Sequence, residues 1–112
     1  MSIQSTNVYT SPATGDGYAS VHTGACRLLG FVAENQTGGT VYVQIHDGYV
    51  KPANDSVPVM SIKLAANAQA VLILDPTMSI SLATGLEVCS SSTGKKLTVG
   101  APTDLFLTVL WV

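Results

Sequence analysis

The chain has 112 residues and a net charge of −2, and only 11% of its residues are charged whereas 46% are hydrophobic. This length suits one domain, and of the five basic residues only Lys95 and Lys96 are adjacent, so no basic cluster favours binding to a nucleic-acid backbone. An ordinary soluble domain carries roughly 25% charged residues. A chain with so few is expected to be covered by copies of itself or by a larger assembly.

Residues 1–17 are polar, rich in Ser, Thr and Gly, and show no sustained hydrophobic period. Two interpretations stay open for them, a frayed terminus or an extended arm that lies on a neighbouring subunit. Ile3, Val8 and Tyr9 are the residues that would anchor such an arm. The segment lacks the basic head and apolar run of a secretory signal. No apolar run approaches the roughly 20 residues of a membrane helix, so we expect a protein made in the cytosol that does not contact a membrane.

The clearest unit follows a short expected strand at residues 18–22. Two β-rich runs, 25–35 and 40–50, flank Gln36-Thr37-Gly38-Gly39, and this pattern predicts a β-hairpin. Alternation of apolar and polar residues in the second run is typical of a strand with one buried face. Gly30 in the first run predicts a β-bulge or a close approach of another backbone.

The rest of the chain continues as short strands separated by turns. Residues 51–57 form a loop by their Pro, Asn, Asp and Ser content. Continuous apolarity in residues 69–74 predicts a strand buried on both faces, and Asp75-Pro76 ends it. Further strands are expected at residues 58–64, 78–83, 86–91, 97–99 and 104–112.

Eight or nine short strands without a helical segment predict an all-β fold. We expect a single-domain antiparallel β-sandwich or jelly-roll-like barrel over residues 18–112, with residues 1–17 as a polar N-terminal arm. Phe31, Phe106 and Trp111 are expected in the core, with the tyrosines around its rim.

The sequence contains no recognisable catalytic, metal-binding or cofactor-binding motif. His22 and His46 have no partner at metal-ligand spacing. His46 precedes Asp47, but adjacent strand residues point to opposite faces, which argues against a His–Asp pair. Cys26 and Cys89 are expected to be buried free thiols, although a bridge between them stays open. We therefore expect no catalytic residues, no cofactor and no metal.

The stretch from residue 27 to 112 resembles a type of small β protein found in the virions of tailed bacteriophages. The resemblance rests on the order of four segments: LLGFVAENQTGGTVYVQIHDG (28–48), VPVMSIKLAANAQAVLIL (57–74), ATGLEVCSSST (83–93) and DLFLTVLWV (104–112). Each motif alone is of low specificity, and together they cover about three-quarters of the chain.

The resemblance implies a non-enzymatic virion protein, assembled in the bacterial host cytoplasm. We expect a capsid decoration or cement protein that forms a homo-oligomer, with a trimer favoured, and that binds the major capsid protein. The candidate assembly interface comprises Ile3, Val8, Tyr9, Tyr18 and Trp111, and deleting residues 1–17 is expected to weaken particle binding without unfolding the sandwich.

Two other functions stay open. The first is a tail, baseplate or head–tail connector subunit. The second is a carbohydrate-binding sandwich for host attachment, in which Tyr42, Tyr49 or His46 would contact sugar rings.

Overall fold

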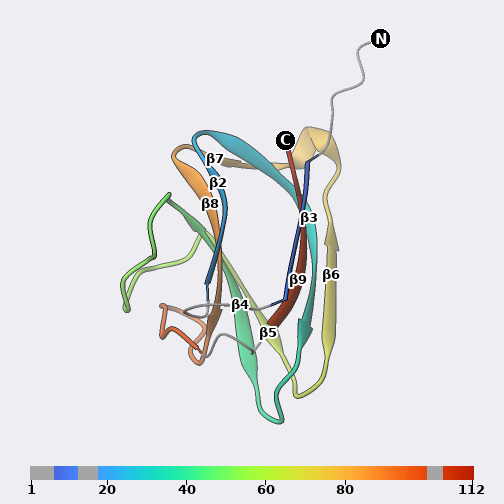
Figure 1. Ribbon diagram of the computed structural model, residues 1–112, viewed down its shortest axis with the longest axis vertical. Coiled ribbons are helices and arrows are strands. Elements are labelled where there is room, and N and C mark those ends of the chain that lie inside the picture. Colours follow the sequence, from blue (N-terminus) through green and yellow to red (C-terminus); the bar gives the residue numbers. More distant parts are fainter. Residues whose placement is uncertain (1–6, 13–17, 101–104) are drawn as a thin grey trace.

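Two antiparallel sheets pack face to face in the computed structural model, which describes residues 7–12, 18–100 and 105–112 (Figure 1). Sheet A has the strand order β1-β9-β3-β6, with the short β7 also paired to β3, and sheet B has the order β2-β8-β4-β5. The elements are β1 (Asn7–Pro12), β2 (Tyr18–Thr23), β3 (Cys26–Asn35), β4 (Val41–Asp47), β5 (Met60–Leu64), β6 (Gln69–Ile73), the 3₁₀ turn η1 (Pro76–Met78), β7 (Ile80–Leu82), β8 (Gly85–Ser91) and β9 (Leu105–Trp111).

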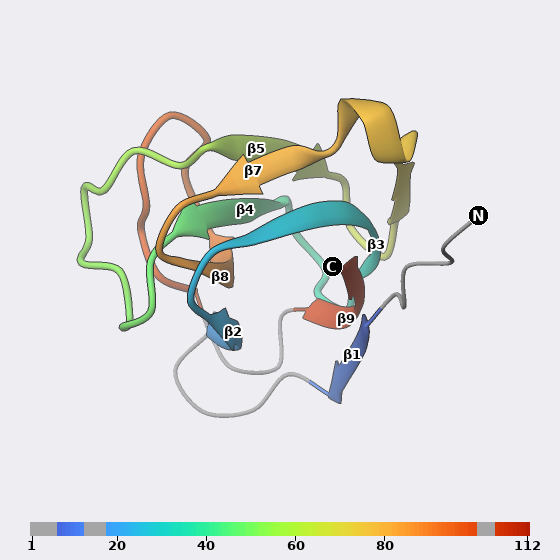
Figure 2. The ribbon, with the colours of Figure 1, turned by 90° about the horizontal axis from the view of Figure 1, so that it is seen from above.

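This strand order is that of a jelly roll. When β7 is set aside, four strands in the order 1-9-3-6 face four strands in the order 2-8-4-5, as in a double Greek key. The prediction of an all-β, antiparallel sandwich is therefore confirmed, and the view from above separates the two sheets (Figure 2). In the described ranges no helical segment is long and apolar enough to cross a membrane.

The core lies between the two sheets and follows from the alternation within each strand. On sheet A, Phe31 and Val109 are fully buried, and on sheet B, Ile45 and Val88 are. Phe31 was expected there, but the expectation for Phe106 was wrong, because this side chain is 39% exposed on the outer face of β9. Its neighbours in the strand, Leu105 and Leu107, point into the core instead.

The predicted hairpin between residues 25–35 and 40–50 is wrong, because β3 and β4 lie in opposite sheets. The intervening turn carries the chain from one sheet to the other, and the buried Asn35 side chain fixes the crossing. Its Nδ2 donates to Gly39 O (2.8 Å) and Ala65 O (2.9 Å), while its Oδ1 accepts from Thr37 N (2.9 Å). A Gly-Gly turn is compatible with a hairpin and with a crossing between sheets. The crossing is favoured here because it lets the apolar faces of β3 and β4 pack against each other.

Gly30 fulfils both parts of its prediction. The pairing of β3 with β9 shifts register between Leu28 and Gly30, which marks a bulge. A Cβ atom at Gly30 would also collide with the backbone carbonyl oxygen of Leu72 in β6. Only glycine therefore allows β6 to approach β3 at this point.

Strand β6 is not buried on both faces, so that prediction is wrong. It lies at the edge of sheet A, and Val71 and Ile73 are 62% and 66% exposed. Its inward residues Ala70 and Leu72 pack against the core. The continuous run of apolar residues therefore reflects one strand face that packs on the core and a second apolar face that is exposed to solvent.

The boundary of the expected N-terminal arm needs correction. Residues 7–12 form β1, which pairs with β9 along its whole length, from Asn7 opposite Trp111 to Pro12 opposite Phe106. Residues 1–6 and 13–17 of the expected arm lie outside the described ranges. Deleting residues 1–17 would remove an edge strand, so we now expect that truncation to destabilise sheet A.

Candidate functional site

The outer face of sheet B carries an enclosed polar cluster. Because Val43 and Ile45 of β4 point into the core, Gln44 and His46 point outward, and the same alternation turns Glu87 and Cys89 of β8 outward. The register places Gln44 opposite Cys89 and His46 opposite Glu87. These four side chains, which we call the sheet B cluster, are all buried although they lie on the outside of the sandwich.

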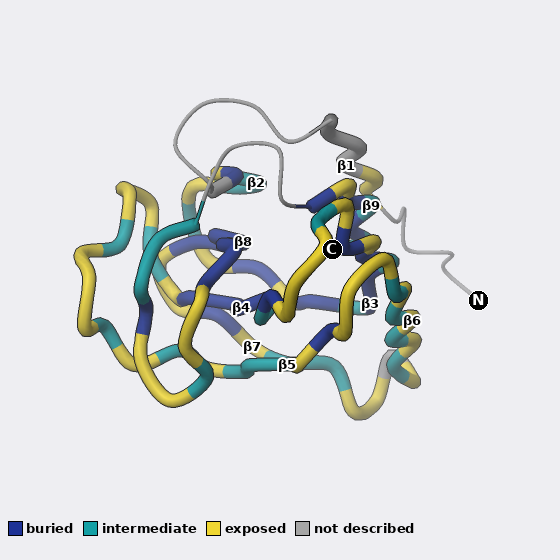
Figure 3. The backbone as a smooth tube through the Cα atoms, turned by 90° about the horizontal axis from the view of Figure 1, so that it is seen from below, coloured by how far each residue is buried: buried dark blue, intermediate teal, exposed yellow. Residues whose placement is uncertain are grey.

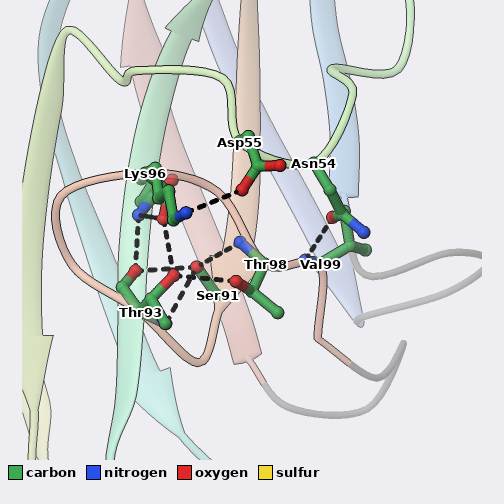
Figure 4. Close-up of polar contacts among 8 residues, drawn as sticks. Asn54, Asp55, Ser91, Thr93, Lys96, Thr98 and Val99 are labelled. Carbon is green, nitrogen blue, oxygen red and sulfur yellow. Dashed lines mark hydrogen bonds and ion pairs between the residues drawn. The ribbon is translucent and has the colours of Figure 1, made fainter.

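The loop 92–100 lies over Gln44 on this face, because its backbone binds the Gln44 side chain, and it is tied to the loop 48–59 (Figure 4). Their backbones exchange hydrogen bonds, from Asp55 N to Leu97 O and from Leu97 N to Ser56 O, each 2.8 Å long. Lys96 Nζ lies 3.1 Å from Asp55 Oδ1, and Val99 N donates to Asn54 Oδ1 at 2.9 Å. The loop expected at 51–57 is therefore fixed in place, and the strand expected at 97–99 is reduced to one bridge between Val99 and Ser91.

Gln44 connects the covering loop to His46. Its Nε2 donates to Thr93 O at 2.8 Å and is 3.3 Å from both Gly94 O and Lys96 O. Its Oε1 must then act as an acceptor for His46 Nε2, 3.0 Å away, so this nitrogen carries the proton in the neutral ring. Burial lowers the pKa of His46, which favours that neutral form.

Glu87 is the least satisfied member of the cluster. Its side chain is fully buried, and neither carboxylate oxygen makes a hydrogen bond of good geometry. Burial raises the pKa of Glu87 to about 7, and the Ser20 hydroxyl, opposite it on β2, offsets this only in part. The side chain is therefore poised to lose its proton near neutral pH.

Cys89 lies in the same cluster but is not an activated nucleophile. Burial, together with the charge of Glu87, raises the pKa of the Cys89 thiol to about 12, against a smaller opposing effect of Lys51. The thiolate is the reactive form, so this thiol is inert at neutral pH. Cys26 is also free and buried, as expected, and burial raises its pKa too.

Asp47 lies apart from His46, as the alternation predicts. Its carboxylate accepts hydrogen bonds from Ala83 N (3.0 Å) and Thr84 N (2.9 Å), which lower its pKa and anchor the turn into β8. Across the described residues, no three His, Cys, Asp or Glu side chains are placed to hold a metal ion.

The outer face of sheet A is the first of two exposed apolar surfaces. Cross-strand rows place Val8, Leu110, Gly30 and Ile73 side by side, and Thr108, Val32 and Val71 in the next row. Phe106 of β9 lies in the third row, opposite Glu34. We call this the sheet A surface: Val8, Val32, Val71, Ile73, Phe106 and Leu110.

A second set of exposed apolar side chains lies at the two ends of the loop 48–59. Tyr49, Val50, Val57 and Val59 are all exposed, Val57 most of all at 79%. We call these four residues the loop surface. Both ribbon views place this loop and β6 on opposite sides of the molecule (Figures 1 and 2).

The expected interface residues do not form one surface. Val8 is exposed on the sheet A surface, whereas Trp111 packs against the core and its ring lies 4.1 Å from that of His22. Ile3 and the side chains of Tyr9 and Tyr18 lie outside the described parts of the structure.

Most of the sheet A surface escapes sequence analysis. Val71, Ile73 and Phe106 read as core residues because they are apolar, and only their strand positions reveal that they face outward. The signal available in 105–111 was Thr108, the polar residue of this strand, which lies two positions after Phe106 and therefore on the same face.

In comparisons with known proteins, the chain matches no protein-family model, no curated protein sequence and no solved structure.

Proposed function

We propose that this chain is a non-enzymatic structural subunit of a tailed-bacteriophage virion, a capsid decoration protein that associates with copies of itself and with the major capsid protein. The observation that carries the proposal is the pair of exposed apolar surfaces on opposite sides of one small sandwich. Exposed apolar patches on a soluble protein mark interaction sites. A cross-linking subunit needs two of them, facing different neighbours.

Three further properties support an assembly role. The jelly roll occurs in viral capsid domains, although it also occurs in lectins. Only 11% of residues are charged, which is low for a surface that stays in water. The loops 48–59 and 92–100 are tied down by hydrogen bonds and an ion pair, so the loop surface is held ready for docking.

The loop surface is the part that we assign to the capsid. Its apolar side chains project from a loop that is fixed in place, and repetition around a particle makes many modest contacts durable. The same surface would serve a tail or connector subunit, and that alternative differs in the number of copies on the particle.

The carbohydrate-binding alternative has less support from the geometry. His46 is buried beneath the covering loop, and the ring of Tyr42 lies against Gly94, where an added Cβ would come within 2.8 Å of it. Of the three side chains expected to contact sugars, only Tyr49 is exposed.

Adding purified protein back to particles that lack it tests the proposal. We expect wild-type protein to bind in a saturable manner and the variant Val57→Ser to bind at least about tenfold more weakly, because an exposed apolar anchor is lost. Ala66→Ser, a similar change in the exposed turn after β5, is the matched control and should bind like wild type. Failure of the wild-type protein to bind any part of the particle would overturn the proposal.

A further inference from the structure

The sheet A surface differs from the outer face of sheet B in having no cover among the described residues. Loops bury even polar side chains on sheet B, whereas on sheet A the side chains of Val71, Ile73 and Val8 stand in solvent. In Figure 3, exposed residues alternate with residues of intermediate burial along β6. An edge strand with this many exposed apolar residues is a hazard for aggregation unless a partner covers it.

Two opposite charges lie at the two ends of this surface. Arg27 and Glu34 are both exposed, and their neighbours Cys26, Leu28, Ala33 and Asn35 are buried, so both charged side chains lie on the outward face of β3. They are seven positions apart along the strand, which is at most roughly 23 Å because the bulge shortens it. Between them lie Gly30, which adds no side chain, and the half-buried Val32.

We propose that two copies of this chain pack their sheet A surfaces against each other about a two-fold axis, with the two β3 strands antiparallel. In this arrangement Arg27 of each copy faces Glu34 of the other, and the apolar rows meet between the two ion pairs. A parallel arrangement would place like charges together, which is destabilising. The inference deepens the proposed assembly role and rests on it, because it names the partner of one of the two surfaces.

The apolar side chains of the surface supply about half the area of a standard interface. With four of its side chains between 39% and 66% exposed, the patch is on the order of 400 Å², comparable with the largest apolar patch on a typical monomer. A standard interface uses about 800 Å² per partner, so the polar rim must supply the remainder. Two copies of one self-complementary surface form a closed pair, and this favours a dimer over the trimer expected from the sequence.

Analytical ultracentrifugation of the full chain over a concentration series tests the pair. We expect a reversible equilibrium between the 11.6 kDa chain and a species of twice that mass. Arg27→Glu and Glu34→Arg should each weaken the pair at least about tenfold, because each places two like-charge contacts in the dimer. The double variant with both changes should return to within about threefold of wild type, since the swapped charges again face opposite charges.

A chain that stays monomeric or forms a trimer would overturn the inference, and so would single variants that leave the equilibrium unchanged or a double variant that restores nothing. Ile73→Ser provides a second probe that leaves the charges intact, and it should also weaken the pair. Circular dichroism establishes that each variant is folded. A monomeric protein that still binds particles through the loop surface would refute the pair and the proposed self-association, and would leave the proposed binding to the capsid protein standing.

Discussion

Replacing Glu87 by Gln should stabilise the protein at neutral and alkaline pH and hardly affect it in mild acid. Glutamine has the shape of a protonated glutamate but cannot ionise. The wild-type carboxyl is fully buried without a hydrogen bond of good geometry, and burial raises its pKa to about 7 from an ordinary value of 4.5. Ionising the Glu87 carboxyl therefore costs free energy in the folded protein but not in the unfolded chain.

The sign and size follow from these two pKa values. Between about pH 4.5 and 7 the folded state keeps a proton that the unfolded state has released, so the stability contributed by this group decreases as pH rises through that window. The full difference corresponds to about 3 kcal/mol. The free energy of unfolding of Glu87→Gln minus that of wild type should therefore grow by about 2 kcal/mol between pH 5 and pH 8.

The comparison between variants is needed because His46 acts in the opposite direction. Its lowered pKa makes the folded state less stable as pH falls through the range near 6.5, which partly masks Glu87 in the wild-type profile. Urea denaturation of both proteins from pH 5 to pH 8 measures the difference directly. Asp55→Asn is the matched control at an exposed carboxylate, and Asn suits its positive φ of 72°. Parallel profiles for wild type and Glu87→Gln would refute the reasoning.

Three further predictions address the fold itself. Gly30→Ala should lower the free energy of unfolding by about 2–3 kcal/mol because the added Cβ would collide with β6. Gly38→Ala is the control and should have little effect, because a Cβ added there meets no atom within 4 Å. Equal effects of the two variants in urea denaturation would contradict the close approach of β6 to Gly30. Asn35→Ala should cost about 3 kcal/mol by the same measurement, since one buried and two partly buried carbonyl groups lose their donor. A near-neutral change would show that the crossing between sheets does not need this side chain. Cys26 and Cys89 should react with a thiol reagent at pH 8 only after unfolding, and a fast-reacting thiol in the native protein would contradict their burial.

Strand positions were accessible to sequence analysis because alternation and turn residues are local signals. The strands at 60–64 and 85–91 and the bulge at Gly30 were predicted within a few residues. The pairing of strands was not accessible in the same way. Gln36-Thr37-Gly38-Gly39 permits both a hairpin and a crossing between sheets, and the choice depends on which distant strands complete each sheet.

The exposed apolar surfaces and the sheet B cluster were harder to predict for a related reason. Val71 and Ile73 are apolar like core residues, and only the position of β6 at the sheet edge makes them surface residues. Glu87 and His46 became neighbours through strand pairing, and Gln44, which binds His46, is held by the loop that follows β8. Composition, by contrast, is read directly from the sequence, and the low charge content of 11% is one of the grounds on which an assembly role is proposed.

The central claim is that this chain is a repeated component of a virion shell. The most direct test of this proposal is the copy number of the chain in purified virions of the proposed phage, measured by quantitative mass spectrometry against the major capsid protein. A ratio near one, or a simple fraction of one, is the predicted result. A few copies per particle would contradict a shell role and indicate a tail or connector subunit, and absence from the particle would contradict the virion assignment altogether.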